Sequence, residues 1–426
     1  MEFLIILTIL ILFIFSAWPK YGLYILAFSL PFIGIEFEIL NFSIPIVDAI
    51  ALLLFISFLI NYFGQKNKPK LKWPIIYPFL IFLSLSFISV LLSDNFNDSL
   101  YNFLRWPFFL YFAYLFTGAN IISNAKILKN TIISVALSSI LVLLTGYLSL
   151  LSQDIFYSFF RLQGIMILNH FPFGDNHNLI AEYLNVGTFL ILITREFLKT
   201  KKSRNMADIL FVFSLLGLLL TFSRSAWITL ALQLLVYFLY KAYYKKRERV
   251  AIFLLFLLSL IILLPVFYRM NILQDENVGS TKSRILLNEI TISAWQEKPF
   301  FGHGNGQFIN LVDKSVRFKA QHGEAIDAHG FLQKIITENG TFGLVAYLFI
   351  IIYLIKITIL ALNRYYPKIA WLLPLALAVW GGLFFQFFNT SYYKGKVWLP
   401  ILLLYLAIKF LDEKYVKKNK SATPIT

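Results

Sequence analysis

Long apolar segments recur along this chain and are separated by short polar connections. Most of them are close to the roughly 20 residues that a helix needs to cross the hydrocarbon core of a bilayer. The segment at 20–33 is short for a full crossing, so the pattern predicts 12 or 13 transmembrane helices. The predicted spans lie near residues 3–18, 20–33, 44–63, 74–93, 100–117, 130–151, 177–197, 206–221, 224–243, 250–267, 340–361, 369–388 and 395–411.

One polar segment, residues 268–339, is much longer than the other connections. Apolar residues recur at helical spacing in its first half, through Leu286, Ile290 and Trp295, and this pattern ends at Pro299. A glycine-rich turn follows at 302–306. The sequence shows neither an internal repeat nor a linker to a second domain. We therefore predict a single membrane domain over residues 1–426 that contains one large, partly helical loop.

Composition supports a membrane protein. Hydrophobic residues make up 59% of the chain and charged residues 14%, which leaves too little polar surface for a soluble domain. The fold class predicted is an all-α polytopic membrane protein. There is no cysteine, which excludes disulfides and thiolate metal sites. The first segment lacks a basic start and a clear small-residue cleavage site, so we expect it to be retained as a span.

The basic residues predict the orientation of the spans. The net charge is +16, and the lysines and arginines gather in alternate connections. Such connections face the cytoplasm in most membrane proteins. The basic clusters therefore act as topology signals, and they give no reason to expect a nucleic-acid partner. The cytoplasmic connections are predicted near 66–72, 126–129, 199–204, 241–249 and 364–368, which places 34–43, 94–99, 152–176, 222–223, 268–339 and 389–394 on the outer face.

Two arginines occupy outward connections that are otherwise poor in cations. Arg161 stands in FFRLQG, and Arg224 lies in a tight turn between two spans. An arginine at membrane depth usually needs an anionic partner or a water-filled cavity. The alternative is a guanidinium group that extends to the interface and anchors a helix end. Arg284 is a third candidate for an anion site, and its alternative role is to cap or solvate the loop helix that it begins.

The seventh predicted span begins with a polar stripe. Asn178, Glu182 and Asn185 recur at helical spacing in an apolar helix, and His177 lies at its outer end. Such a stripe must face the interior of the bundle or a cavity. A hydrogen-bond network between helices and a ligand-lining role both explain it.

The end of the long loop carries further candidates for chemistry. The turn around His303 is rich in glycine, but it matches neither a P-loop nor a dinucleotide fingerprint. Asp327 and His329 follow, at the head of a short amphipathic helix that meets Gly340. A histidine in this position could serve as a base, a metal ligand or a surface residue.

These motifs together resemble the O-antigen ligase and polymerase superfamily. The resemblance lies in TFSRSAW at 221–227, KPFFGHGNGQF at 298–308, and His329-Gly330 followed by GTFG at 340–343. RLQG at 161–164 and DNHNLIAEYL at 175–184 are similar to that family's other outward-loop pattern. Gly330 is a departure, because ligases commonly carry a polar residue after the histidine. This departure bears on the choice between ligase and polymerase, and it leaves the superfamily unaffected.

The resemblance implies a membrane-embedded architecture like that of C-type glycosyltransferases (GT-C-like). It implies that a glycan is transferred from an undecaprenyl-diphosphate donor to a hydroxyl acceptor, such as lipid A-core, in the bacterial inner membrane with the active site facing the periplasm. The family is taken to invert the sugar without a metal, cofactor or nucleotide sugar. Polymerisation of lipid-linked repeat units and transfer to a protein are alternatives within the superfamily.

The chemistry of the residues fits these roles. Guanidinium groups match phosphate oxygens in paired hydrogen bonds, so Arg161, Arg224 and Arg284 are predicted to bind the diphosphate. A neutral imidazole can accept a proton near pH 7, so His329 is predicted to be the catalytic base or the group that orients the acceptor. The residues predicted to line the substrate are His177, Asn178, Glu182, His303 and Asp327.

Two functions of other classes remain open at this point. A secondary transporter would explain the intramembrane polar residues, but it predicts inverted repeats, which the sequence does not show. A metal-dependent hydrolase could use Asp327, His329 and His322 as ligands. A D-x-H spacing is common by chance, and no second strong ligand pair accompanies it.

Overall fold

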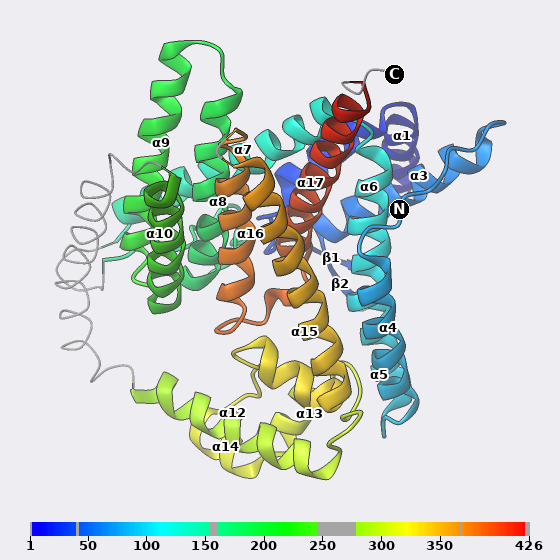
Figure 1. Ribbon diagram of the computed structural model, residues 1–426. Helices are drawn as coiled ribbons and strands as arrows, with labels where there is room; N and C mark the ends of the chain where they lie inside the picture. Colours follow the sequence, from blue (N-terminus) through cyan, green and yellow to red (C-terminus); the bar gives the residue numbers. More distant parts are fainter. Residues whose placement is uncertain (1, 40–41, 154–159, 245–277, 367, 422–426) are drawn as a thin grey trace.

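The computed structural model describes residues 2–39, 42–153, 160–244, 278–366 and 368–421, and within these ranges the chain is almost entirely helical (Figure 1). The predicted all-α membrane fold is confirmed. The first half contains α1 (Glu2–Ala17), α2 (Pro19–Ser29), α3 (Ile46–Gly64), α4 (Ile76–Leu91), α5 (Phe96–Phe103), α6 (Thr117–Ile121) and α7 (Ala125–Leu151). The second half contains α8 (His177–Phe197), α9 (Lys201–Leu220), α10 (Arg224–Tyr244), α12 (Val278–Glu297), α13 (Gln307–Lys314), α14 (Val316–His322), α15 (Phe331–Tyr365), α16 (Leu372–Phe385) and α17 (Gly395–Ser421).

Each span predicted within the described ranges corresponds to a helix, and the span predicted at 250–267 lies outside them. Within the described ranges, five helices are long and apolar enough to cross a membrane, or six if α1 and α2, which are bent by 117° relative to each other, count as one span. Large apolar side chains are exposed on the outer sides of these helices, for example Leu52 and Phe63 on α3 and Val212 on α9. A bilayer accounts for such exposure, which water would not favour.

Helix α8 forms the centre of the bundle. It packs against α7, α9, α10 and α16, and most of its side chains are buried. The side chain of Asn176 accepts a hydrogen bond from the backbone N–H of Asn178 and so caps the helix at its outer end. This cap explains why the polar DNHN sequence starts the helix at His177, as predicted.

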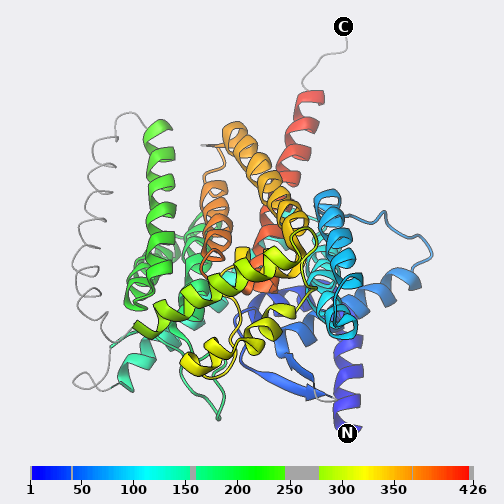
Figure 2. The ribbon, with the colours of Figure 1, turned by 90° about the horizontal axis from the view of Figure 1, so that it is seen from below.

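The long polar loop forms a separate helical layer. Helices α12, α13 and α14 lie across one end of the bundle, at the bottom of Figure 1, and cross one another in Figure 2. A small apolar core joins them, built from Leu286, Leu287, Phe308, Val312 and Phe318. The loop predicted at 268–339 is therefore partly helical from residue 278 onward, and residues 268–277 lie outside the described ranges.

Helix α15 connects this outer layer to the bundle, and it changes direction at Gly340. This residue has φ 65° and ψ −168°, which places it outside helical geometry. A Cβ atom here would lie 2.4 Å from the backbone of Phe300. Only glycine combines this conformation with such a close approach. Residues before Gly340 therefore belong to the outer layer, and those after it form the span predicted to begin there.

A short antiparallel hairpin interrupts the helical pattern. Strand β1 (Glu36–Ile39) pairs with β2 (Phe42–Pro45), with Glu36 opposite Pro45. The hairpin lies in the first outward connection and was not predicted. Alternation of polar and apolar side chains over only four residues is too short a signal to separate a strand from the end of a span.

Candidate functional site

Three motifs that are distant in sequence and predicted to face outward meet at one end of α8, α9 and α10. The backbone N–H of Leu162 donates to the carbonyl of Leu220 at 2.9 Å, which holds the RLQG segment against the end of α9. The hydroxyl of Ser223 donates to the side-chain carbonyl of Asn178 at 2.7 Å. Arg161, His177 and Arg224 therefore come from three neighbouring chain segments on one face of the bundle.

Arg284 lies close enough to both Arg224 and His329 to interact with each of them electrostatically. Burial lowers the pKa of the Arg284 guanidinium, and the positive charge of Arg224 lowers it further. Burial also lowers the pKa of His329 below its ordinary value of 6.5, and the charge of Arg284 acts in the same direction. Asp327 partly opposes this effect. The structure thus brings two of the predicted diphosphate ligands to the predicted base.

These two arginines lack anionic partners. Neither Arg224 nor Arg284 forms an ion pair with a carboxylate anywhere in the part of the chain that the structure describes. The Nε of Arg284 is buried, and no hydrogen-bond acceptor among the described residues reaches it. A buried N–H group without a partner costs free energy comparable to a lost hydrogen bond. Two like charges with an unused donor form a place where an anion is stabilised.

Arg161 lies in a different environment from the other two arginines. Its side chain is half-buried, and burial lowers its pKa. The side chain of Gln153 accepts a hydrogen bond from the backbone N–H of Arg161 at 3.0 Å and donates to its carbonyl at 2.7 Å. The charge of Arg161 acts on His177. These contacts fix the segment at the start of α8, beside the turn that carries Arg224.

The loop that carries His329 is held by its neighbours on α12 and α15. The backbone N–H of His329 donates to the side-chain carbonyl of Gln333 at 2.9 Å. Gln333 in turn donates to Asn288 on α12. No hydrogen bond to a ring nitrogen of His329 occurs among the described residues. The imidazole is partly exposed, so both nitrogens can meet a substrate.

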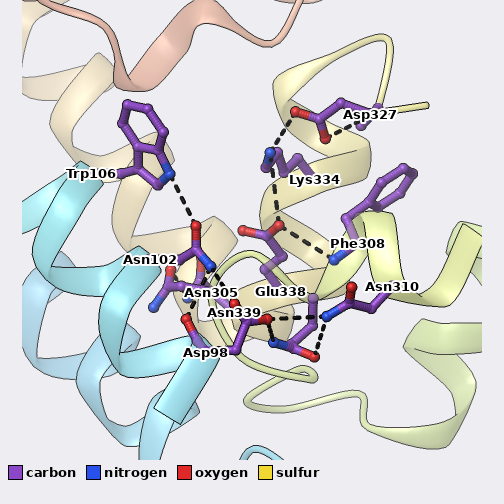
Figure 3. Close-up of polar contacts among 12 residues, drawn as sticks. Asp98, Asn102, Trp106, Asn305, Phe308, Asn310, Asp327, Lys334, Glu338 and Asn339 are labelled. Atoms are coloured by element: carbon purple, nitrogen blue, oxygen red, sulfur yellow. Dashed lines mark hydrogen bonds and ion pairs between the residues drawn. The ribbon is translucent and has the colours of Figure 1, made fainter. Parts of the chain in front are cut away.

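Asp327 is engaged with a buried lysine rather than with the His329 ring. Its carboxylate forms an ion pair with Lys334 at 2.6 Å and also accepts the backbone N–H of Ala328 at 2.8 Å. Lys334 is also 3.9 Å from Glu338, one helical turn further along α15. Figure 3 shows these three side chains in line. Among the described residues, neither Asp327 nor a backbone carbonyl forms a hydrogen bond with the His329 ring that would fix its tautomer.

The line of charges continues into the glycine-rich turn. The carboxylate of Glu338 accepts the backbone N–H of Phe308 at 3.4 Å, and its carbonyl accepts that of Gly304 at 2.8 Å (Figure 3). Sequence analysis missed Lys334 and Glu338. Their spacing of four residues was the available signal, but charges at that spacing usually form an exposed helix face.

Gly330, the departure from the ligase pattern, has a structural explanation. A Cβ atom at this position would lie 2.5 Å from the carbonyl oxygen of Phe387. The next residue, Phe331, donates its backbone N–H to Gln386 at 2.9 Å. The loop before α15 thus lies directly against the end of α16, and this close approach leaves no room for a side chain beside His329.

Two residues predicted to line the substrate have other partners. Glu182 is buried and forms an ion pair with Lys396, and it accepts hydrogen bonds from Gln386 and Asn389 at 2.8 Å each. This is the network between helices that sequence analysis left open. His303 is buried, and its Nε2 lies 2.9 Å from the carbonyl of Ala294.

The metal-site alternative requires several ligands close to His329. The described ranges contain no group of three or more histidine and carboxylate side chains that could hold a metal ion. The carboxylate of Asp327, one of the proposed ligands, is occupied by Lys334.

Comparison with known proteins gives two matches. Residues 209–348 match the O-antigen ligase family. This part of the chain is therefore similar to the O-antigen ligases. The match includes Arg224, Arg284 and His329, whereas Arg161, His177 and Glu182 lie before it. The resemblance inferred from the motifs is confirmed.

The chain is also similar to a curated protein. The chain is 28% identical over 214 residues to a ComP-specific O-oligosaccharyltransferase from Acinetobacter baylyi (strain ATCC 33305 / BD413 / ADP1). The match covers 45% of this chain and 38% of that protein, so the chain spans less than half the length of the relative. Both matches are similarities over part of the chain, one to a ligase family and one to an oligosaccharyltransferase.

Proposed function

We propose that this protein transfers a glycan from an undecaprenyl-diphosphate carrier to a hydroxyl acceptor at the periplasmic face of a bacterial inner membrane. The observation that carries the proposal is the group formed by Arg224, Arg284 and His329. Two arginines without carboxylate partners among the described residues, one with a buried unpaired N–H, lie beside a histidine whose pKa is lowered. A sugar bound to a diphosphate would bring the negative charge that pairs with the two arginines and the anomeric carbon that reacts.

The reaction is a single displacement. The acceptor hydroxyl oxygen attacks the anomeric carbon, and the bond between that carbon and the diphosphate oxygen breaks. His329 accepts the hydroxyl proton, because its lowered pKa keeps the imidazole neutral near pH 7. The diphosphate leaves with the bonding electron pair, and Arg224 and Arg284 stabilise the charge that develops on it.

Inversion and metal independence follow from this arrangement. One in-line displacement inverts the configuration of the anomeric carbon, because the acceptor enters opposite the leaving group. The two guanidinium groups supply the positive charge that a divalent ion would bring to a diphosphate. We therefore propose a metal-independent, inverting glycosyltransferase, whose activity survives EDTA.

The acceptor separates three versions of this function. We favour a ligase that transfers the glycan to lipid A-core, in line with the O-antigen ligase family match. Polymerisation, in which a second lipid-linked glycan is the acceptor, uses the same chemistry. Transfer to a protein is supported by the similarity to the Acinetobacter relative, which is a ComP-specific O-oligosaccharyltransferase.

A transfer assay tests the proposal. The purified protein is given the lipid-linked glycan from its own host and, in separate reactions, lipid A-core, further lipid-linked glycan or a protein acceptor. Extension of lipid A-core supports the ligase, and extension of another acceptor supports the corresponding alternative. If no acceptor is extended while donor and protein are intact, the proposed transfer is wrong.

A further inference from the structure

The glycine-rich turn at 302–306 has no role in the reaction described above, but it forms one wall of a separate cleft. The cleft has a volume of about 360 Å³, within roughly the 300–1,000 Å³ range of sites for small ligands. Asp94 and Asn95, from the connection between α4 and α5, face His303, Gln307 and Asn310 across it. All of its lining residues except Leu311 are polar or charged.

Both carboxylates of this cleft are already paired with lysines, and Lys314 is the remaining charged side chain of its lining. Asp94 forms an ion pair with Lys298 at 2.7 Å, which lowers the pKa of its carboxyl group. Asp313 forms an ion pair with Lys319 at 2.8 Å. A phosphate would meet two carboxylates here, and a free cation would have to displace a lysine. Lys314 adds one cation to a lining that otherwise offers paired carboxylates and neutral hydrogen-bonding groups, and this mixture favours an uncharged, polar ligand over a compact anion.

The amide side chains are fixed before any ligand arrives. The carboxylate of Asp98 accepts hydrogen bonds from Gln307 at 2.7 Å and from Asn310 at 3.0 Å (Figure 3). Asn310 also donates to Gln307 at 3.1 Å. Side chains held in this way lose little conformational entropy when they bind a ligand. Amide and carboxylate groups together present both donors and acceptors, which suits neighbouring hydroxyl groups.

The cleft lies within reach of the reaction centre. The turn is attached to the end of the first segment of α15 by hydrogen bonds from His303 to the Thr337 carbonyl at 2.9 Å and from Gly304 to that of Glu338 at 2.8 Å. His329 lies just before the start of the same segment. At 1.5 Å of rise per residue, the segment from Phe331 to Asn339 spans roughly 12 Å, a distance that a short glycan can cover.

We propose that this cleft binds uncharged, hydroxyl-rich sugar residues of the glycan, remote from the carbon that reacts. A peptide is a weaker candidate, because the cleft offers only Leu311 as an apolar contact and peptide sites usually depend on buried apolar anchors. The proposal rests on the proposed function in taking a glycan as the ligand. It assigns the glycine-rich turn to substrate selection rather than to phosphate binding.

The test uses the full chain in detergent and the host's repeat-unit glycan, released from its lipid diphosphate by mild acid. Binding is measured by saturation-transfer NMR and titration. Asn95→Ala and Asn310→Ala should each weaken binding by roughly 2- to 10-fold, because each removes one neutral hydrogen-bonding group. The matched controls are Asn97→Ala and Ile309→Ala, which alter exposed neighbours outside the cleft.

The outcomes separate this proposal from the proposed function. Arg224→Lys should retain full affinity for the free glycan, since the released glycan carries no diphosphate. In the transfer reaction the cleft variants should raise the KM for the donor and leave kcat unchanged. Equal effects in the control variants, no binding by the unaltered protein, or competition by inorganic phosphate would overturn the cleft assignment. Weakened glycan binding in a protein that transfers nothing would support the cleft and contradict the transferase.

Discussion

At the scale of single residues, the site depends on positive charges that are left without partners. Most charged side chains in a membrane protein are paired, because an isolated charge is costly near the bilayer. Here Asp327 and Glu182 each form an ion pair with a lysine. Arg224 and Arg284 have no carboxylate partner among the residues that the structure describes. A protein keeps such an arrangement where a ligand brings the missing negative charge.

Arg224→Lys tests this use of charge. A lysine keeps the charge but cannot form the paired hydrogen bonds of a guanidinium group with phosphate oxygens. We expect activity to fall by roughly 10- to 100-fold, because such charge-assisted bonds contribute on the order of 1.5–3 kcal/mol. Transfer is measured with the lipid-linked donor. Arg317→Lys, an exposed outer-layer arginine paired with Glu289, is the control and should keep full activity. A fully active Arg224→Lys protein would favour the helix-anchor role.

His329→Ala tests the base. General base catalysis contributes roughly 10²- to 10⁴-fold, so this variant should fold, bind donor and turn over very slowly. The control is His170→Ala, which changes an exposed histidine.

The pH profile gives a second measurement of the role of His329. The base must be neutral, so activity is present above the pKa of His329 and is lost as the pH falls through it. Because that pKa is lowered from 6.5, the loss should begin at a lower pH than for an ordinary imidazole. A pH profile with no loss of activity on its acid side would remove this role from His329.

At the scale of elements, the spans were predictable and the site was predictable only in part. Length and hydropathy fix a membrane helix almost alone, so the predicted span at 177–197 has the bounds of α8. Arg224 and His329 lie in recognisable motifs, whereas Arg284 was only a candidate at the predicted loop helix. The pairing of Glu182 with Lys396 joins residues more than 200 positions apart, and no local pattern reveals such a contact. The lysine between two carboxylates was missed because its helix looked amphipathic and exposed.

Lys334→Met tests whether this buried line of charges holds the outer layer to the bundle. The substitution leaves the carboxylates of Asp327 and Glu338 without their cation, which should destabilise the protein by about 3–5 kcal/mol. The triple variant with Asp327→Asn and Glu338→Gln should recover much of that loss. Arg317→Met breaks an exposed ion pair and should cost about 0–1 kcal/mol. Thermal unfolding in detergent measures all three. Equal melting temperatures for Lys334→Met and Arg317→Met would show that the buried pair adds no stability.

At the scale of the whole molecule, every part of the site lies at one end of the bundle. The predicted outward connections supply Arg161, the turn before Arg224, the outer helical layer and the loop that carries His329 (Figure 1). The predicted cytoplasmic connections supply none of them. A site of this kind can meet a lipid-linked diphosphate only at the membrane face where these connections lie, so the proposed function depends on the orientation of the chain.

Cysteine labelling tests that orientation, and the absence of native cysteine makes each introduced residue the only thiol. Val316 in the outer layer is 81% exposed, and Asn67 is exposed in a connection rich in lysine. Because basic connections remain in the cytoplasm, Val316→Cys should react with an impermeant thiol reagent in intact spheroplasts. Asn67→Cys should react only after the membrane is permeabilised. The opposite pattern would place Arg224, Arg284 and His329 at the cytoplasmic face. A donor presented to the periplasm could not reach them there, and the transfer proposed above would then be excluded whatever the geometry of the site.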